Sequence, residues 1–500
     1  MENKEKCAAK NVPGEKKKAG IGYKIWAVIF VLISVGLIGM IVDLNILKGS
    51  LLISICCCIG AVALLFFIIL CRKSKGKAGK ITALILSLLL SAGYLFGIYY
   101  IGSTVDFLSA VTGDKYEISE YYVVVRDDSK YEKIKDIKGE KVLISDDPDA
   151  AYSKGRNQLK KEVKVEFTAA GHDTDVCEAV LKDNAVGFLS VQGYEIGKAN
   201  VEKFKDDSRI LYTVRVKTKA EDISKGVDVT KKPFNIYITG IDTSGSIDTV
   251  SRSDVNMVVT VNPVTKKILM TSIPRDSYIP LQGAGHQGSM DKITHTGIYG
   301  VDETVGAAEA LLSTDMNYYA KVNFTTVREL VDVMGGIDVE SDLDFMSRDG
   351  YLYVAGTNHL NGDQALSFAR ERKAFTDGDF QRNRDQQLVL KAIIKKATTS
   401  SAILTGYTDI LSTIKEYFST NMKPEDIQKL IKMQLSDMKE WNIETQGLKG
   451  TGGSEPCFAA GGAYASVVHL DESSVAKAKD RINEVLSDTG ETEEKEDEKK

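Results

Sequence analysis

The 500-residue chain is predicted to combine three membrane-spanning helices with two α/β units, a small one followed by a larger one with a central mixed sheet. Three observations predict this fold class. Long apolar runs occupy the first 105 residues, and strand-like and helix-like segments alternate after them. The length corresponds to about three domains at roughly 100–200 residues each. An apolar fraction of 43% is sufficient to bury their cores.

The overall composition excludes two other classes of protein. The chain has 64 Lys+Arg against 69 Asp+Glu, for a formal net charge of -5, so a globally basic nucleic-acid binder is excluded and no nucleic-acid partner is expected. Only Cys177 and Cys457 follow residue 72, which excludes a disulfide-rich secreted scaffold. The sequence leaves open whether these two cysteines pair.

Residues 25–105 are predicted to contain the three spans, because a helix crosses about 30 Å of hydrocarbon with about 20 apolar residues. A buried core helix or a cleaved signal peptide could explain one apolar run, but not three in succession. Residues 1–24 and 72–80 are rich in Lys and Arg, so both are expected in the cytoplasm. An odd number of spans then places everything after about residue 105 outside the plasma membrane. The uncharged runs are Ile25–Val42, Gly49–Cys71 and Ile81–Val105.

Residues 106–230 are predicted to form a small extracellular accessory domain of the α/β type. It shows no catalytic constellation, and His172 beside Asp173 is interpreted as a surface histidine. The polar segment Thr218–Lys232 is typical of a linker, and residues 488–500 form an acidic tail predicted to be disordered. The expected strands and helix are Tyr121–Val125, Lys141–Ser145, Val163–Thr168, Ala185–Val191 and, for the helix, Asp175–Lys182.

Residues 231–487 are predicted to form the larger domain, in which strands and helices alternate as in layered α/β proteins. The expected strands are Phe234–Thr239, Asn256–Val261, Ile268–Ile273, Tyr318–Phe324 and Ile337–Glu340. The expected helices are Glu303–Leu312, Val327–Met334, Gly362–Ala369 and 380–397.

Charged side chains occur in pairs near the ends of these elements. Arg252 and Asp254 are two residues apart in an extended stretch, so both are expected on one face. Arg275 and Asp276 follow a strand end, where open α/β sheets bind their ligands.

A second group of charges lies around the long helix at 380–397. Arg370 and Arg372 are again two residues apart, at the end of the preceding helix. Asp379, Arg382 and Gln386 have the i, i+3, i+7 spacing of one helical stripe, whereas Arg384 and Asp385 point elsewhere. The alternative for Asp379 is a purely structural role as an N-cap.

Together these residues predict a polyphosphate site. Guanidinium groups bind phosphate oxygens bidentately and stay charged when desolvated, and a pair of Asp can hold Mg²⁺ or Mn²⁺. Surface salt bridges are the alternative, but they contribute only about 0–1 kcal/mol each and do not require these spacings. The six basic and four acidic candidates below have a summed charge of about +2, or about +4 with a bound divalent ion. A pyrophosphate diester has a charge of about -2 and would be attracted to such a site. The basic candidates are Arg252, Arg275, Lys292, Arg370, Arg372 and Arg382, and the acidic ones are Asp242, Asp254, Asp276 and Asp379.

Other chemistries are excluded by their missing signatures. The chain has no Walker loop, dinucleotide fingerprint, HExxH helix, CxxC pair or GxSxG elbow. Its five histidines show no metal-ligand spacing.

Seven ordered motifs between about 233 and 400 resemble the LytR-CpsA-Psr family. The layout before residue 230 is similar to capsule-type members of that family, which have three membrane spans and an accessory domain. The motifs are FNIYITGID, RSD at 252–254, SIPRDSY at 272–278, MDKITHTGIYG at 290–300, VMGGIDV at 333–339, LNGDQALSFARER at 360–372 and GDFQRNRDQQ at 378–387.

The resemblance implies a phosphotransferase that moves an anionic or capsular glycopolymer from undecaprenyl pyrophosphate to peptidoglycan. It implies that Asp242 and Asp254 hold the Mg²⁺, that Arg275 acts in catalysis, and that Asp276 or Asp379 orients or deprotonates the acceptor hydroxyl. Asp385 stands where the family often has a basic residue, so Arg384 is omitted as a ligand. The implied pyrophosphate ligands are Arg252, Arg275, Arg370, Arg372, Arg382 and Gln386, with Lys292 near them.

Several alternatives stay open at this point. The same site could serve a polyprenyl-pyrophosphate phosphatase, with water as acceptor, or a non-enzymatic, membrane-anchored regulator of wall assembly. The polymer could be capsular, as the layout favours, or a teichoic acid. An apolar stripe on the long helix could line a lipid pocket or pack in the core; it consists of Leu388, Val389, Ala392, Ile393 and Ile394.

Overall fold

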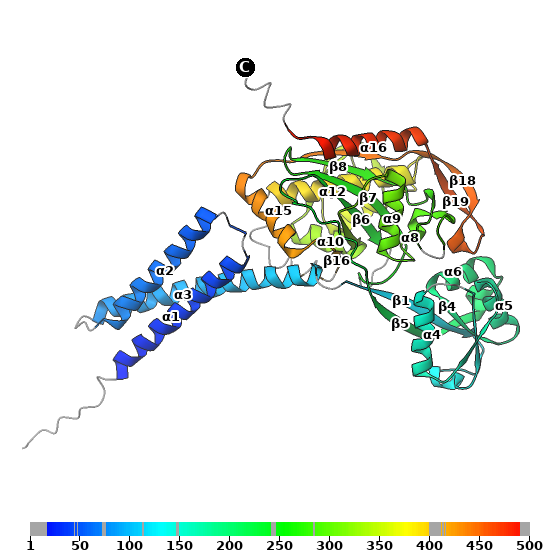
Figure 1. Ribbon diagram of the computed structural model, residues 1–500, viewed down its shortest axis with the longest axis horizontal. Helices are drawn as coiled ribbons and strands as arrows, with labels where there is room; N and C mark the ends of the chain where they lie inside the picture. Colours follow the sequence, from blue (N-terminus) through cyan, green and yellow to red (C-terminus); the bar gives the residue numbers. More distant parts are fainter. Residues whose placement is uncertain are drawn as a thin grey trace, which may run out of the picture. The chain divides into compact units, whose positions relative to one another are not determined.

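The structure is a computed structural model in which two compact units separate, Met1–Phe107 with Ile431–Ser436 and Leu108–Leu430 with Asp437–Lys500. Figure 1 shows the elements of both units in sequence colours. The residues that the structure describes are 18–44, 46–47, 49–72, 77–112, 115–146, 150–241, 247–283, 286–399, 412, 415 and 417–490.

The three predicted membrane helices are confirmed as helices long and apolar enough to span a bilayer. They are α1 (Lys18–Leu44), α2 (Gly49–Cys71) and α3 (Lys77–Thr112). Most of their large apolar side chains are exposed, as a lipid-facing surface requires. The aromatic ring of Phe30 packs edge-on against Phe66 and stacks on Tyr94, at centroid distances of 5.6 and 5.7 Å. The chain is therefore membrane-anchored, and its orientation stays a prediction.

The accessory domain is a five-stranded sheet in the order β3-β2-β4-β1-β5. β2 runs parallel to β3 and β4, and β1 is antiparallel to β4 and β5. The rings of Tyr121, Tyr152 and Phe188 stack at its centre, with centroids 5.5–5.6 Å apart. Its strands are β1 (Tyr116–Arg126), β2 (Lys141–Ile144), β3 (Glu166–Ala169), β4 (Val186–Ser190) and β5 (Ser208–Lys219). Its helices are η1 (Ile134–Ile137), α4 (Ala150–Glu162), α5 (Asp173–Lys182), α6 (Val191–Asn200) and α7 (Phe204–Asp207).

The predicted linker at 218–232 is only partly a linker. It lacks helix and strand after β5 ends at Lys219, but it packs onto the larger domain. Val229 is completely buried beneath the main sheet, and the Lys225 ammonium lies 2.6 Å from carboxylate oxygens of both Glu309 and Asp315. The polar composition of the segment did not indicate this packing, because only a few of its side chains, among them Val229, enter the core.

The larger domain is built on a six-stranded mixed sheet in the order β16-β11-β6-β7-β8-β17, which confirms the predicted architecture. β11 is parallel to β6 and β17 is parallel to β8, while the remaining neighbours are antiparallel. Its strands are β6 (Phe234–Ile241), β7 (Ser253–Asn262), β8 (Lys267–Ser272), β11 (Tyr318–Asn323), β16 (Phe418–Thr420) and β17 (Asn442–Gly447).

Helices and short hairpins surround this sheet. The helices are α8 (Ile293–Thr296), α9 (Val301–Leu312), α10 (Phe324–Val333), α11 (Gly362–Arg370), α12 (Asp379–Thr399), α15 (Pro424–Asp437), α16 (Glu472–Ser487) and the short η2 (Phe458–Ala460). The hairpin strands are β9 (Tyr278–Pro280), β10 (Met290–Lys292), β12 (Ile337–Ser341), β13 (Phe345–Met346), β14 (Leu352–Tyr353), β15 (Gly356–Leu360), β18 (Gly450–Pro456) and β19 (Tyr464–Leu470).

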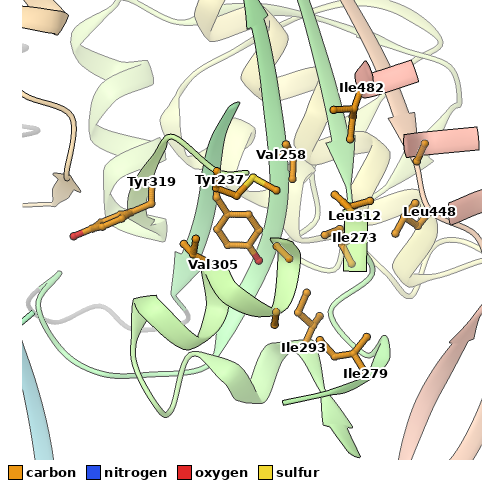
Figure 2. Packing of buried hydrophobic residues seen from close by; sticks show 14 of the residues in the cluster. Tyr237, Val258, Ile273, Ile279, Ile293, Val305, Leu312, Tyr319, Leu448 and Ile482 are labelled. Carbon is orange, nitrogen blue, oxygen red and sulfur yellow. The ribbon is translucent and has the colours of Figure 1, made fainter. Parts of the chain in front are cut away.

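Alternation along the strands places a core on each face of the sheet. Tyr237 and Val258 point to the face covered by α9 and α16, where Figure 2 shows them beside Val305, Leu312 and Ile482. Neighbouring residues of the same strands point to the opposite face, against α12 and α15; they include Ile236, Met257, Val259 and Met270. The sheet is thus the middle of three layers.

The segments that carry Asp254 and Arg275 meet at one edge of the sheet. Because β7 is antiparallel to β6 and β8, its first residues lie beside the last residues of both neighbours, with Ser253 opposite Ile241 and Met257 opposite Ser272. β11, parallel to β6, ends at the same edge.

Candidate anion-binding site

Arg275 and Asp254 form the centre of the site. A guanidinium nitrogen (Nη1) of Arg275 lies 2.5 Å from Oδ2 of Asp254, and both side chains are largely buried. The hydroxyl of Thr294 donates to Oδ1 of Asp254 at 3.0 Å. Thr294 is a site residue that the sequence analysis missed, although its position two residues after Lys292 in one motif was an available signal.

Lys292 and Asp276 extend the site along the β9–β10 hairpin. The ammonium of Lys292 lies 3.1 Å from Oδ1 of Asp276, and Arg275 Nε lies 3.7 Å from the same oxygen. The hairpin fixes this pair, since Lys292 is the register partner of Tyr278 and the amide of Thr294 donates to the carbonyl of Arg275 at 3.0 Å.

The first turn of α12 supplies the third group. A guanidinium nitrogen (Nη2) of Arg382 lies 2.8 Å from Oδ1 of Asp379, and Nε of Arg372 lies 3.2 Å from it, which confirms the predicted i, i+3 contact. Both Asp379 oxygens are buried without a hydrogen-bond partner in the described part of the chain, so Asp379 does not act as a helix cap there.

The electrostatics show that these groups converge. Burial lowers the pKa of Arg382 most strongly, and the neighbouring charges of Arg275 and Arg372 lower it further, against the opposing effects of Asp379 and Asp254. The four cations Arg275, Lys292, Arg372 and Arg382 exceed the carboxylates of Asp254, Asp276 and Asp379 by one charge.

Two buried donors in this cluster have neither a hydrogen-bond acceptor nor a close ion pair among the residues described. They are Nε of Arg275 and Nε of Arg382, whereas Nη2 of Arg382 pairs with Asp379. Because a buried donor without an acceptor costs about 1–3 kcal/mol, such donors are stable only where an anion binds or where the cost is tolerated for function. The arrangement therefore suits a phosphate-type anion, whose oxygens accept several charge-assisted hydrogen bonds.

Three predicted ligands have surroundings of their own. Arg252 is exposed just before β7 whereas Asp254 is buried, and the shared face of these two residues stays a prediction. The Arg370 guanidinium lies over the Phe324 ring at 4.4 Å, and the Gln386 amide donates to the carbonyl of Ala369 at 3.4 Å.

The segment that carries Arg252 packs tightly against the 290–300 motif. A Cβ at Gly297 would come within 2.7 Å of the Ser253 amide nitrogen and also meet the Ser251 carbonyl oxygen. The glycine therefore permits the close approach of the two segments, which holds the start of β7 in place.

A divalent cation would find hard oxygen ligands here. Each Asp254 oxygen has one partner in the structure, Thr294 or Arg275, and a carboxylate oxygen can accept more than one contact. Asp242, the second predicted metal ligand, lies outside the residues that the structure describes. The residues that are described fit Mg²⁺ by ligand type.

The apolar stripe on α12 packs in the protein core. Val389 and Ala392 are buried among side chains of α10, α11 and the β12–β15 segment, with Leu388 and Ile393 beside them. Ile394 packs beneath the main sheet. Of the two predicted roles for this stripe, the structure favours core packing.

Asp385 on α12 is expected to make the stability of the protein pH-dependent. Burial raises the pKa of Asp385 to about 7, although Gln381 donates to it at 2.9 Å. A carboxyl in an unfolded chain titrates near pH 4, so between about pH 4 and 7 the folded protein holds an extra proton. The free energy of unfolding should therefore fall as pH rises through this window, by up to about 1.4 kcal/mol per pH unit.

Asp385→Asn is expected to remove this slope and to stabilise the protein at pH 7.5 by about 1–3 kcal/mol. Thermal and denaturant unfolding of the detergent-solubilised chain between pH 4.5 and 8 measures both effects. Asp128→Asn is the matched control, because Asp128 is exposed and pairs with Arg126 at 2.5 Å. A slope that persists unchanged in the Asp385 variant would contradict the assignment.

Fold and site together define a membrane-anchored α/β protein with a buried cationic cluster at one edge of its main sheet. The chain belongs to the LytR-CpsA-Psr family, which it matches over residues 197–483, and it is an enzyme of the transferase class. Two curated relatives are named polyisoprenyl-teichoic acid–peptidoglycan teichoic acid transferase TagU. The protein of Bacillus mycoides is 37% identical over 254 residues, 49% of this chain and 81% of that protein. The protein of Bacillus anthracis is 39% identical over 226 residues, 44% of this chain and 72% of that protein.

Solved structures of related proteins cover the same part of the chain. TagU of B. subtilis is 32% identical, with a TM-score of 0.40, over 52% of this chain and 98% of that one. TagT bound to LI-WTA is 28% identical, with a TM-score of 0.42, over 53% of this chain and 94% of that one.

Proposed function

We propose that the chain transfers an anionic or capsular glycopolymer from undecaprenyl pyrophosphate to peptidoglycan outside the plasma membrane. The observation that carries the proposal is the buried pair Arg275 and Arg382, whose Nε donors have no hydrogen-bond acceptor among the described residues and suit the oxygens of a polyphosphate-type anion. The relatives' names support a polyisoprenyl-linked donor and a peptidoglycan acceptor, and they favour teichoic acid as the polymer. The three N-terminal helices would keep the site near membrane lipid.

The proposed reaction is an in-line phosphoryl transfer. A peptidoglycan hydroxyl oxygen attacks the phosphorus that carries the polymer, a new P–O bond forms, the bridging P–O bond breaks, and undecaprenyl phosphate leaves. Such reactions depend mostly on positioning and charge stabilisation. Arg275 and Arg382 would bind the pyrophosphate oxygens, and Lys292 and Arg372 would flank them.

The acceptor's proton requires a carboxylate, for which Asp276 and Asp379 are the candidates. Oδ1 of each Asp pairs with a cation, Arg382 at 2.8 Å for Asp379 and Lys292 at 3.1 Å for Asp276. Asp379 is the better placed of the two, because its Oδ2 is buried without a hydrogen-bond partner in the described part of the chain. We therefore assign proton acceptance to Asp379 and the orientation of Lys292 and Arg275 to Asp276. Asp254, with Asp242, would hold Mg²⁺, which when bound would neutralise charge on the departing phosphate.

Reconstitution of the full chain in liposomes tests this function. The liposomes carry lipid-linked polymer, and wall fragments and Mg²⁺ are added outside. A covalent polymer–wall adduct is the expected product. Release of polymer phosphate alone would identify a phosphatase, and an intact lipid-linked polymer would indicate a non-enzymatic binder; either result contradicts the proposal. Chelation by EDTA tests the metal separately, and is expected to abolish adduct formation.

A further inference from the structure

Asp291 is a completely buried carboxylate immediately before Lys292, and the proposed reaction gives it no role. Its Oδ1 accepts from the Lys292 amide at 2.7 Å and lies 2.5 Å from Nδ1 of His295. Its Oδ2 accepts from the Ala459 amide at 2.7 Å. A buried carboxylate with three partners is firmly fixed, and it fixes in turn the backbone of each partner.

The same cluster contains the thiol of Cys457, which raises the possibility of a metal site. The ligand atoms of Asp291, His295 and Cys457 all lie within 4.8 Å of one another. However, two ligands of a tetrahedral Zn²⁺ at about 2.0–2.2 Å are separated by more than 3 Å, whereas the carboxylate and imidazole atoms are 2.5 Å apart. This distance is that of a charge-assisted hydrogen bond, so the cluster is a hydrogen-bonded one.

Ala459 belongs to the turn between β18 and β19, and this hairpin contacts the anion site directly. The amide of Val468 donates to the carbonyl of Asp276 at 2.7 Å, and the hydroxyl of Tyr278 donates to the carbonyl of Pro456 at 2.8 Å. Asp291 is therefore the third point at which the hairpin is joined to the 276–278 segment and to β10, which carries Lys292.

The accessory domain reaches the same turn. Gln192 lies in the first turn of α6, directly after β4, and its amide nitrogen donates to the carbonyl of Ala459 at 2.7 Å. The carboxyl end of a parallel strand is where α/β sheets commonly bind ligands. In this protein the carboxyl end of β4 contacts the turn between β18 and β19 of the larger domain through Gln192. The carbonyl of Ala459 thus accepts a hydrogen bond from Gln192, and its amide donates one to Asp291.

We propose that Asp291 is a positioning residue that holds Lys292 beside Asp276, and that the accessory domain supports this arrangement through Gln192 and Ala459. The inference rests on the proposed function, because it assumes that Lys292 contacts the pyrophosphate. It gives the accessory domain a part in shaping the site.

A double-mutant cycle tests whether Asp291 acts through Lys292. The full chain in detergent is titrated with geranyl pyrophosphate, and the variants are Asp291→Asn, Lys292→Ala and both together. Each single variant is expected to raise the Kd about tenfold, and the double variant should bind no more weakly than Lys292→Ala alone. Asp338→Asn is the matched control, because Asp338 makes a similar 2.6 Å contact with His359 in an exposed position.

The outcomes separate this inference from the proposed function. Wild-type protein that fails to bind the probe would count against the proposed function. Binding by wild type, with an Asp291→Asn effect that persists in the Lys292→Ala background, would overturn the inference alone. Stoichiometric zinc in wild type, measured by mass spectrometry and lost in Asp291→Asn, would also overturn it.

If Asp291→Asn does not fold, Gln192→Ala takes its place in the cycle. Its expected effect is about a threefold rise in Kd that disappears when Lys292 is alanine. A Gln192→Ala variant that binds like wild type would refute the contribution of the accessory domain.

Discussion

Arg275→Ala is expected to reduce polymer transfer by about 10³-fold or more, the largest functional effect of any single substitution in the chain. Arg275 contacts Asp254 at 2.5 Å and Asp276 at 3.7 Å, and its Nε is buried without an acceptor. Removing the guanidinium withdraws charge from the anion and also leaves Asp254 without its counter-ion. The rate of adduct formation in liposomes, under saturating donor, measures the effect.

Arg275→Lys separates the two contributions of this side chain. Lysine keeps the positive charge beside Asp254 but cannot form the planar, bidentate contact with phosphate, so an intermediate rate is expected. Arg328→Ala is the control, because Arg328 forms a half-exposed pair with Glu329 at 2.9 Å and should change the rate little. Adduct formation at the wild-type rate in Arg275→Ala would exclude Arg275 from the reaction.

The sequence predicted elements whose hydrophobic pattern is strong. The three spans and the central strands β6, β7 and β8 were found because long apolar runs and strict alternation leave few alternatives. The strands β5, β16 and β17 were missed. β5 alternates apolar with polar side chains only in its second half, VRVKTK, a strand signal that the prediction did not use. β16 has three residues, and the NIETQG of β17 is mostly polar. These are edge strands, which pairing with a neighbour stabilises more than their own composition does.

The candidate site was predictable in its residue types more than in its contacts. Chemistry and spacing identified Arg275, Asp254 and Arg382, which converge in the structure. The two-residue spacing of Arg252 and Asp254 gave no information on burial: Arg252 is exposed and Asp254 is buried, since β7 begins only at Ser253. The contact between Gln192 and Ala459 joins residues 267 positions apart, and no local pattern encodes such a contact.

Arg382→Met is expected to weaken the binding of geranyl pyrophosphate by about 10²-fold while stabilising the ligand-free protein by about 1–2 kcal/mol. The Arg382 side chain is only 7% exposed, its Nε lacks an acceptor in the described part of the chain, and burial together with Arg275 and Arg372 lowers its pKa. A methionine of similar length would remove these costs, and Asp379 would keep Arg372 as a partner at 3.2 Å. A variant that binds the ligand more weakly but unfolds less easily would show that Arg382 serves ligand binding at a cost in stability.

Arg384→Met provides the comparison on the same helix. Arg384 is half-exposed, donates from Nε to Gln381 at 2.9 Å and pairs with Asp377 at 2.6 Å, so its loss should change neither affinity nor stability by more than about 0.5 kcal/mol. Isothermal titration and thermal unfolding of the same detergent-solubilised preparations measure both quantities. A loss of stability in Arg382→Met comparable to its loss of affinity would show that Arg382 supports the fold, and the cluster at the edge of the sheet would then be structural.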